Sequence, residues 1–352
     1  MKILAFETSC DDTSIALFEN EVLLAMHTKS QIHIHNETGG VVPEVASREH
    51  ANVIFEVLDE VLKAGKTTLQ EINYLAVTTH PWLVPSLLTG MTVASTLSQT
   101  LKIPIIAINH IEAHIFSNFL ERSESEIEFP LVCLTVSGGH NEIYYMQDMF
   151  TREKLGQSQD DAAGEAYDKV AKMLGLGYPG GPIISKLAAD YEKPFSWDPS
   201  QKPLFPRVYL EKSGFEFSFA GLKSAVSREI ERRKNNSVRL VSSETSLTEQ
   251  DQKEISYEFQ RAVNEVLCYK IISAAEQKWV KTVLLAGGVS ANDDLRTRIW
   301  EETQKLGLNF FSPAKKLYCM DNAAMIGILA YYRVKYWKFE HKIGTVELWI
   351  SC

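Results

Sequence analysis

The chain has 352 residues, of which 45% are hydrophobic and 23% charged, and its formal net charge at pH 7 is −9. These values are typical of a globular protein with a large core, and the length favours about two domains. They argue against a membrane protein, since no apolar run is long enough to span a bilayer, and against a nucleic-acid footprint over the whole surface, although a local basic patch stays open.

The first part of the chain predicts an α/β lobe that opens with strands. Apolar runs predict strands at residues 1–7, 13–18 and 22–29, with a polar turn between the first two. A long amphipathic segment then predicts a helix over 43–64, with Pro43 in its first turn. The next elements are expected to be a strand at 73–79, a helix at 81–101 and a strand at 103–108.

A second cycle of the same pattern begins near residue 129. Strands are expected at 130–137, 141–146, 282–286 and 308–311, and helices at 162–174, 182–189, 221–234, 250–279, 291–306 and 322–337. The segment 192–217 is expected to be irregular and the segment 235–250 to be a mobile loop. The repeated pattern predicts two α/β lobes around a cleft: residues 1–129, with the C-terminal helix 322–345 packing back on them, and residues 130–321.

Two histidines one helical turn apart are the strongest chemical signal. His110 and His114 leave the same face of the predicted helix, so both imidazoles can close on one metal ion. Asp321, at the start of the last helix, could supply a third ligand and leave one coordination position open. The alternative is two surface histidines and a helix-capping aspartate. Peptidase chemistry is disfavoured, because Glu112 stands one place too late for the His-Glu-x-x-His pattern and points away.

Three turns could hold a nucleotide. Thr8–Ser14 carries two aspartates that could bind a divalent cation, Thr135–His140 carries paired glycines, and Ala286–Asn292 opens a helix whose N–H groups favour an anion. Each alone is more often a plain turn, but three in a two-lobed pattern favour a nucleotide site. None is a P-loop. The acidic segment Asp160–Lys169 also carries small residues, which suggests the close approach of another group, although a capped and solvated helix start would explain it.

Together these motifs resemble those of the TsaD family, the tRNA adenosine threonylcarbamoyltransferases, whose archaeal and eukaryotic relatives belong to the KEOPS complex. The resemblance covers nearly the whole chain. It rests on ordered motifs at Glu7–Thr13, Gly39–Arg48, His110 with His114, Val136–His140, Asp160–Lys169, Tyr178–Pro182, Phe217–Lys223, Gly287–Asn292 and Asp321-Asn322.

The resemblance implies an α/β fold of the actin-like, sugar-kinase and Hsp70 ATPase (ASKHA) type, with two lobes and an interlobe cleft. It implies transfer of a threonylcarbamoyl group from threonylcarbamoyl-AMP to the N6 amine of the adenosine 3′ of the anticodon in ANN-decoding tRNAs, with release of AMP. No covalent enzyme intermediate is needed, so positioning and charge stabilisation are the expected means of catalysis.

The resemblance also implies the residues of the site. His110, His114 and Asp321 would bind one divalent metal ion, iron or zinc. Binding of magnesium together with ATP stays open as a separate expectation. Asp11, Ser137 and Asp168 are the catalytic candidates, and Ser185 is left out because relatives often carry an acid there. The adenylate would be lined by Thr135, Val136, Ser137, Gly138, Gly139, Asp168, Gly181, Gly288 and Asn292.

One departure from the family pattern affects a loop. Relatives usually have Gly-Pro-Gly-Leu where this chain has His80-Pro81-Trp82-Leu83. Glycine tolerates a positive φ and close contact, whereas tryptophan does not do so cheaply. The loop is therefore expected to take another path, or its ligand to sit differently.

The partners implied by the resemblance are tRNA, a TsaB-like paralogue and a TsaE-like ATPase, with a homo- or heterodimer as a further expectation. No membrane association is expected, and five dispersed cysteines without a targeting segment favour the cytoplasm. Two basic stretches could contact tRNA, or could be solvated faces: Arg228, Arg232, Arg233, Lys234 and Arg239, and Arg333, Lys335, Lys338 and Lys342.

Two other functions stay open at this point. An ATP-dependent small-molecule phosphotransferase of the same fold would explain the phosphate turns, but it would not explain the helical histidine pair. A non-catalytic scaffold resembling the shorter TsaB paralogue would lack that pair, which this chain has.

Overall fold

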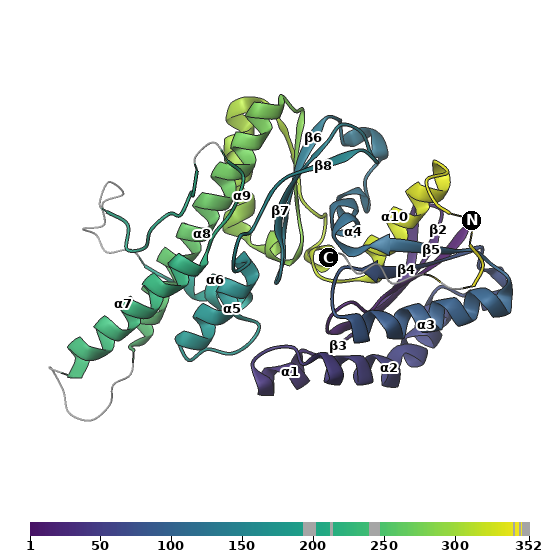
Figure 1. Ribbon diagram of the computed structural model, residues 1–352, viewed down its shortest axis with the longest axis horizontal. Coiled ribbons are helices and arrows are strands. Elements are labelled where there is room, and N and C mark those ends of the chain that lie inside the picture. The colour runs from purple at the N-terminus through teal and green to yellow at the C-terminus, as the bar shows by residue number, and fades with distance from the viewer. Residues whose placement is uncertain (193–201, 212–213, 239–246, 341, 345, 347–352) are drawn as a thin grey trace. The chain divides into compact units, whose positions relative to one another are not determined.

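The computed structural model divides the chain into two units. It describes residues 1–192, 202–211, 214–238, 247–340, 342–344 and 346 (Figure 1). The first unit comprises Met1–Ile127 and Pro313–Cys352, and the second comprises Glu128–Ser312. The second unit thus ends ahead of the boundary at residue 321 that the sequence analysis proposed, and Asp321 lies in the first unit.

A mixed five-stranded sheet forms the centre of the first unit. Its order is β3-β2-β1-β4-β5, with β1 antiparallel to β2, β2 antiparallel to β3, and β4 and β5 continuing parallel to β1. The strands are β1 (Lys2–Glu7), β2 (Asp12–Glu19), β3 (Val22–Ser30), β4 (Tyr74–His80) and β5 (Ile105–Asn109). β1 is apolar on nearly every position because both faces of a central parallel strand are covered.

Helices cover both faces of this sheet (Figure 1). Leu4 and Phe6 belong to the core formed with α2 and α3, while Phe18 faces α10, as the alternation of strand side chains requires. The helices are α1 (Ile32–Thr38), α2 (Pro43–Ala64), α3 (Val84–Leu101), α4 (His110–Phe116) and α10 (Ala323–Lys335), and short 3₁₀ turns occupy Leu69–Glu71, Ser117–Phe119, Glu124–Glu126 and Lys316–Cys319.

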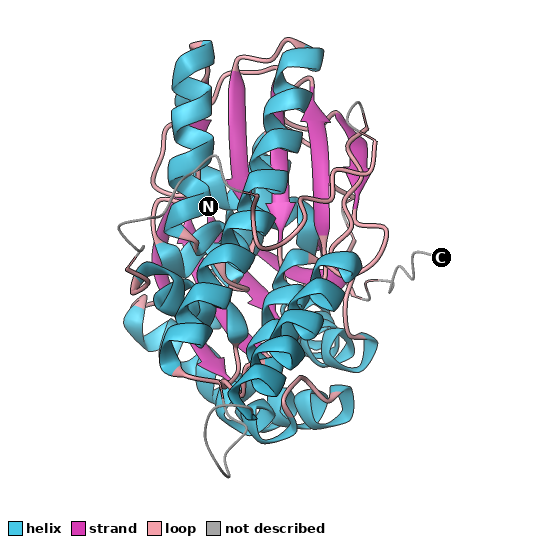
Figure 2. Ribbon diagram, turned by 90° about the vertical axis from the view of Figure 1, so that its left-hand side faces the viewer, coloured by secondary structure: helices cyan, strands magenta, loops and turns pink. Residues whose placement is uncertain are grey.

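The second unit repeats this sheet. Its order is β10-β9-β6-β7-β8, with two antiparallel pairs on one side of β6 and parallel strands on the other. The strands are β6 (Leu131–Val136), β7 (Asn141–Met146), β8 (Arg152–Gln157), β9 (Thr282–Ala286) and β10 (Asn309–Phe311). The helices of this unit are α5 (Ala163–Met173), α6 (Gly180–Ala189), α7 (Ala220–Val238), α8 (Glu249–Lys278) and α9 (Asp293–Leu306), and a 3₁₀ turn lies at Gly288–Ala291. Figure 2 shows the helices and strands of the chain in separate colours.

The expected repeat of strand–turn–strand followed by alternating helices and strands is therefore confirmed. Several details differ. α1 and the edge strand β8 were not expected, because β8 is mostly exposed and polar. α3 begins later than expected, and α7 extends to Val238 into the segment predicted as a loop, of which residues 239–246 lie outside the described residues. Among the described helices, none combines the length and apolar character needed to cross a bilayer.

Candidate functional site

Two helix starts in the first unit position the candidate metal ligands. The Asn109 side chain accepts the Glu112 N–H at 2.9 Å, which begins α4 at His110 directly after β5. Asn322 caps α10 in the same way by accepting the Met325 N–H at 3.1 Å. Asp321 is thereby fixed immediately before α10, and both histidines leave one face of a fully buried helix.

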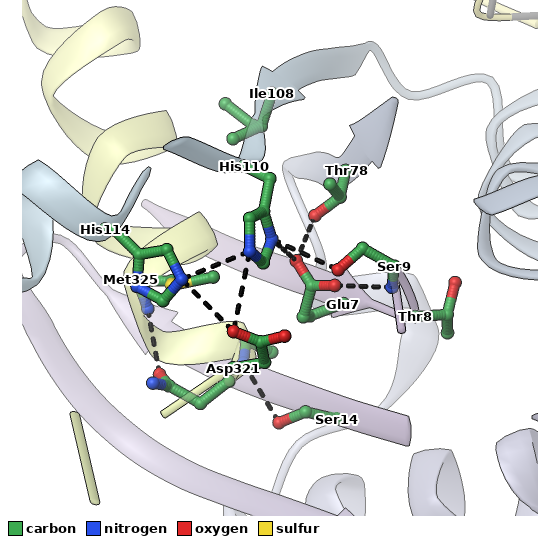
Figure 3. Close-up of polar contacts among 12 residues, drawn as sticks. Glu7, Thr8, Ser9, Ser14, Thr78, Ile108, His110, His114, Asp321 and Met325 are labelled. Carbon is green, nitrogen blue, oxygen red and sulfur yellow. Dashed lines mark hydrogen bonds and ion pairs between the residues drawn. The ribbon is translucent and has the colours of Figure 1, made fainter. Parts of the chain in front are cut away.

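The three side chains point toward one another (Figure 3). His114 Nε2 lies 3.1 Å from His110 Nε2 and 3.1 Å from Asp321 Oδ1, and His110 Nε2 lies 3.5 Å from the same oxygen. Tetrahedral coordination at about 2.0–2.1 Å would separate ligand atoms by about 3.3 Å. The donor set and its spacing therefore fit one divalent ion. The structure brings together the residues that the sequence singled out across 207 positions of chain.

Glu7 supports this triad from behind and was missed as a site residue by the sequence analysis. Its Oε2 lies 3.2 Å from His110 Nδ1, and its Oε1 accepts the Ser9 N–H at 2.6 Å. The Thr78 hydroxyl donates to Oε2 at 2.5 Å, and the Ser9 hydroxyl also lies 3.1 Å from His110 Nδ1. Such a carboxylate–histidine pair orients a metal ligand. A fully buried acid closing an apolar strand was the available signal.

The electrostatics of the cluster are those of buried charges that neutralise one another. Burial opposes the charged form of His110, but the Asp321 and Glu7 carboxylates outweigh it and raise its pKa to about 10. Burial raises the pKa of Asp321, but the neighbouring His110 and His114 lower it by more, so this pKa lies below its usual value. Burial lowers the pKa of His114, whose Nδ1 has no hydrogen-bond partner among the described residues. His114 is therefore neutral, and its imidazole, near the carboxylates of Asp321 and Glu7, can bind a cation.

Glu112 lies on the far side of α4 from this cluster. It is buried and forms an ion pair with Arg333, whose Nη2 is 2.9 Å from its Oε2. Arg333 also donates to the Ala107 carbonyl. Glu112 is therefore occupied as a packing ion pair, in agreement with the argument against peptidase chemistry.

The loop that departs from the family pattern has a backbone conformation that glycine adopts more readily than tryptophan. Trp82 has a φ of 143°. Its indole stacks on His110, with ring centroids 6.4 Å apart and an interplanar angle of 18°. The large side chain is accommodated beside the candidate metal site.

Asp11 and Asp12 lie at the turn between β1 and β2. Burial raises the pKa of both, that of Asp12 to about 7, and nearby Asp321 adds to the effect. The turn is held by His50 of α2, whose Nε2 lies 3.0 Å from the Cys10 carbonyl and whose Nδ1 lies 2.7 Å from the Thr13 hydroxyl. Asp11 is thus placed in the unit that carries the histidine pair.

The glycine turns meet one another in the second unit. The Gly164 and Glu165 N–H groups, at the start of α5, donate to the Ser137 and Gly138 carbonyls at 3.2 and 3.0 Å. A Cβ on Gly164 would lie 2.6 Å from the Ser137 carbonyl, and one on Gly287, whose φ is 84°, would lie 2.4 Å from the Val136 carbonyl. The turns at 135–139 and 286–291 and the start of α5 are therefore packed backbone against backbone.

Asp168 fixes a helix start at this cluster. Its Oδ1 accepts the Gly180 N–H at 2.7 Å at the beginning of α6. The next residue, Gly181, has nothing within 4 Å of the position of a Cβ. The predicted pair thus consists of a carboxylate on α5 that accepts the first N–H of α6 and an open glycine at the next position of α6.

Asn292 is enclosed by protein contacts. It caps α9 by accepting the Leu295 N–H at 2.9 Å, and its amide donates to Ser185 Oγ and Gln260 Oε1, each at 2.8 Å. Asn264 donates to its Oδ1 at 3.1 Å. Ser185, which the sequence analysis set aside, therefore belongs to this cluster, and the α8 residues Gln260 and Asn264 were missed because a helix interior carries no local motif.

The structure thus assembles two separate groups of predicted residues. The metal triad and Asp11 belong to the first unit, whereas the residues predicted to line the adenylate belong to the second.

Comparison with known proteins supplies the relationship. The family described as "TsaD: tRNA N6-adenosine threonylcarbamoyltransferase" matches residues 22–328. A protein of that description from Thermodesulfovibrio yellowstonii is 44% identical over 331 residues, which are 94% of each chain. Those from Fusobacterium nucleatum and Staphylococcus aureus are 42% and 39% identical, over 95% and 96% of this chain and 92% and 93% of theirs.

Solved structures are similar in fold. The activator of the 2-hydroxyisocaproyl-CoA dehydratase from Clostridium difficile superposes with a TM-score of 0.52 at 12% identity, covering 96% of this chain and 97% of its own. Full-length HypF superposes with a TM-score of 0.58 at 14% identity, covering 95% of this chain and 56% of its own. These similarities concern the fold alone, and they confirm the expected α/β class of the ASKHA type.

Proposed function

Because the chain belongs to the TsaD family, the tRNA N6-adenosine threonylcarbamoyltransferases, we propose that its donor is threonylcarbamoyl-AMP and that it releases AMP. The acceptor is the N6 amine of the adenosine 3′ of the anticodon in ANN-decoding tRNAs. The observation that carries this proposal is the convergence of His110, His114 and Asp321 in a buried cluster with Glu7 behind it. Neither a phosphotransferase nor a scaffold needs that arrangement.

His110, His114 and Asp321 would hold one divalent ion, iron or zinc. When bound, the ion would supply Lewis-acid polarisation of a donor oxygen. The chain's own contribution is orientation: Glu7 and Ser9 hold His110 Nδ1 so that Nε2 faces His114 and Asp321. Asp11 lies in the same unit as a second acid and is kept as a catalytic candidate that could hold magnesium with ATP.

The adenylate would be held by the glycine turns of the second unit. Thr135–Gly139 lies on a turn that packs against the turn of Gly287 and the start of α5, and Gly288 follows Gly287. Backbone N–H groups of such turns and helix starts bind phosphates. Ser137 contributes main-chain groups, Asp168 keeps the α6 start and Gly181 in place, and Asn292 flanks the adenosine from the α9 cap. The donor is already an activated anhydride, so positioning suffices and no enzyme nucleophile is required.

The test is to replace the histidine pair. We expect the double variant His110→Ala/His114→Ala to lose bound metal and at least about 100-fold of threonylcarbamoyl transfer to tRNA, because Lewis-acid stabilisation is worth several kcal/mol. Metal is measured by elemental analysis and the modified nucleoside by mass spectrometry, from purified threonylcarbamoyl-AMP and tRNA.

The matched control replaces two histidines of the same unit that lie outside the metal cluster, the partly buried His27 and the exposed His33. The variant His27→Ala/His33→Ala should change neither quantity. Full transfer by a metal-free His110/His114 variant would reject the catalytic part of the proposal. A wild-type protein that makes a phosphorylated small molecule and no modified nucleoside would favour the phosphotransferase instead.

A tRNA-modifying enzyme must bind tRNA, and the structure distinguishes the two basic stretches. Arg333 is committed to Glu112, Lys335 to Glu124 and Lys342 to Glu340. In the other stretch Arg233 is held by three acids of α7 and α8, whereas Arg228 is exposed.

A groove of about 510 Å³ lies between the segment 202–206 and α7, and Lys202, Arg228 and Arg232 line it. Arg232 pairs with Glu229, but Lys202 and Arg228 are exposed and have no ion-pair partner within the described part of the chain. Exposed cations on one groove suit phosphodiester oxygens. This groove is our candidate for tRNA backbone contacts. A TsaB-like paralogue, a TsaE-like ATPase, a homo- or heterodimeric state and the cytoplasm as the location complete the proposal.

A further inference from the structure

Trp82 is a bulky side chain at a backbone conformation that tryptophan rarely adopts. It lies between β4 and α3, is partly buried, and has a φ of 143°. Such conformations persist only where the surrounding contacts determine them, and they gather at functional sites. The contacts of Trp82 therefore indicate what holds it there.

Those contacts lead to one residue of the metal triad by two routes. The indole lies nearly parallel to the His110 imidazole, at 18° and a centroid separation of 6.4 Å, which is an offset stacking geometry. The next residue, Leu83, donates its N–H to the Ser9 carbonyl at 3.1 Å, and the Ser9 hydroxyl lies 3.1 Å from His110 Nδ1. The indole is also within hydrogen-bonding reach of the Cys10 thiol.

His110 needs such a contact to present a fixed nitrogen. Glu7 and Ser9 hold only its Nδ1 edge, and His114 meets it edge to face, at 87°. These contacts, like those of Nε2 with His114 at 3.1 Å and with Asp321 at 3.5 Å, act at the ring nitrogens, and a tilt of the ring would swing Nε2 out of line with His114 and Asp321. An aromatic plane along one face limits the tilt and covers that side of the ring.

We infer that Trp82 is a positioning residue of the metal centre: its indole fixes the plane of His110 and slows the exchange of the bound ion with solvent. The inference rests on the metal site of the proposed function and concerns the retention of the ion rather than the transfer reaction. Ligands held in place lose less freedom when the ion binds, so the ion should leave a preorganised site more slowly.

The first experiment measures release of the ion. The full chain is loaded with zinc alone, mixed with an excess of a chromogenic chelator, and the release rate is followed by absorbance. Trp82→Gly should release zinc roughly 10-fold faster or more, the range in which partners behind a ligand act, and Trp82→Phe should stay near the wild type because it keeps an aromatic plane. Thermal unfolding of each variant shows whether it is folded.

The matched control is Trp279→Gly, in the second unit. Trp279 also has a positive φ, of 52°, and is 88% exposed, so the same substitution there relieves the backbone and leaves the surroundings of the metal site intact. It should release zinc at the wild-type rate. Equal rates for the wild type, Trp82→Gly and Trp279→Gly would overturn the inference.

The second experiment does not depend on Trp82→Gly being folded. Cobalt(II) quenches the fluorescence of an indole next to it, so loading with cobalt alone should dim the wild type, and Trp82→Phe should lose the greater part of that dimming. Undiminished quenching in Trp82→Phe would contradict the position given to Trp82. A wild type that binds neither ion would overturn the proposed metal site, and the inference with it. Slow release together with inactive transfer would overturn the proposed reaction alone.

Discussion

Single buried side chains set the chemistry of the first unit. Glu7 cannot be exposed to water, so its carboxylate takes the donors within reach, which are the Ser9 N–H, the Thr78 hydroxyl and His110. Each of these contacts also fixes its partner. The orientation of His110 is therefore a consequence of satisfying the hydrogen bonds of a buried acid at the end of β1. Asp11 and Asp12, which follow β1, are also shielded from water.

Asp12 provides the prediction at this scale. Burial raises its pKa from 3.8 to about 7, and its Oδ1 has no hydrogen-bond partner among the described residues. A carboxyl whose pKa is raised by folding favours the protonated form in the folded state. The Asp12 carboxyl therefore contributes fully to the unfolding free energy below pH 4. This contribution is lost as the pH rises to about 7, and the loss amounts to roughly 4 kcal/mol at about 1.4 kcal/mol per pKa unit.

Urea unfolding of the metal-free protein between pH 4 and pH 8 measures this effect. We expect Asp12→Asn to remove most of the decline in unfolding free energy between pH 4 and 7. The control Asp59→Asn, at an exposed position of α2, should leave the decline unchanged. Parallel curves for the wild type and Asp12→Asn would contradict the assignment.

Among the helices, α10 has the greatest consequence for the site because it carries Asp321 at its beginning. Its N-terminal N–H groups are held by Asn322 and by Ser14, whose hydroxyl accepts the Ala323 N–H at 2.9 Å. Midway along the helix, Gly327 lies against the Phe18 ring of β2. The distance between α10 and the sheet therefore decides where the Asp321 carboxylate lies relative to α4.

The prediction for this element is a substitution at the contact. A Cβ at Gly327 would lie 2.4 Å from the Phe18 ring, so Gly327→Ala must push α10 or the ring aside. We expect a loss of about 1–3 kcal/mol in unfolding free energy, as for other overpacked cores. Because Asp321 moves with the helix, zinc affinity should fall as well.

Gly221→Ala is the control for this substitution. Gly221 lies in α7 with nothing within 4 Å of a Cβ, so alanine should be neutral or stabilise by up to about 1 kcal/mol through helix propensity. Urea titration gives the stabilities, and a competing chelator gives the affinities. An unchanged stability of Gly327→Ala would show that α10 is not packed on β2 as described.

At the scale of the whole molecule, an acidic protein has to bind an acidic substrate. The net charge of −9 repels RNA at long range, so binding depends on a local excess of cations. Ion pairing within the chain removes most of the candidate lysines and arginines from that role. The groove is also lined by Arg232 and Glu229, which pair with each other, and it keeps Lys202 and Arg228, which form no ion pair with an acid of the described chain.

Reversing those charges tests the groove. We expect Lys202→Glu/Arg228→Glu to weaken tRNA binding at least about 10-fold at low salt. The slope of log affinity against log salt should fall by about 2, because each cation that binds a phosphate adds about one to that slope. Fluorescence anisotropy of labelled tRNA over a range of salt concentrations gives both values.

The matched control, Lys335→Glu/Lys342→Glu, changes the net charge equally at cations that are already paired. It should leave the salt slope near that of the wild type. A larger effect of the control than of the groove variant would move the tRNA contact to α10 and the segment that follows it.

The sequence by itself determined the features that depend on local pattern. The turn-to-turn spacing of His110 and His114, the apolar strands, the glycine turns and the repeated order of elements are all readable because neighbouring residues share one helix face or one strand. Arg152–Gln157 and Ile32–Thr38 escaped notice because an exposed edge strand and a short helix carry little periodicity.

Only the tertiary structure decided which distant side chains meet. Sheet register places Glu7 behind His110, the packing of α10 on β2 brings Asp321 to 3.1 Å from His114, and the loop after β4 lays Trp82 along the imidazole. Ion pairs likewise separated the paired cations from the unpaired ones. These results depend on burial and on contacts between residues far apart in the chain, and local spacing does not encode either.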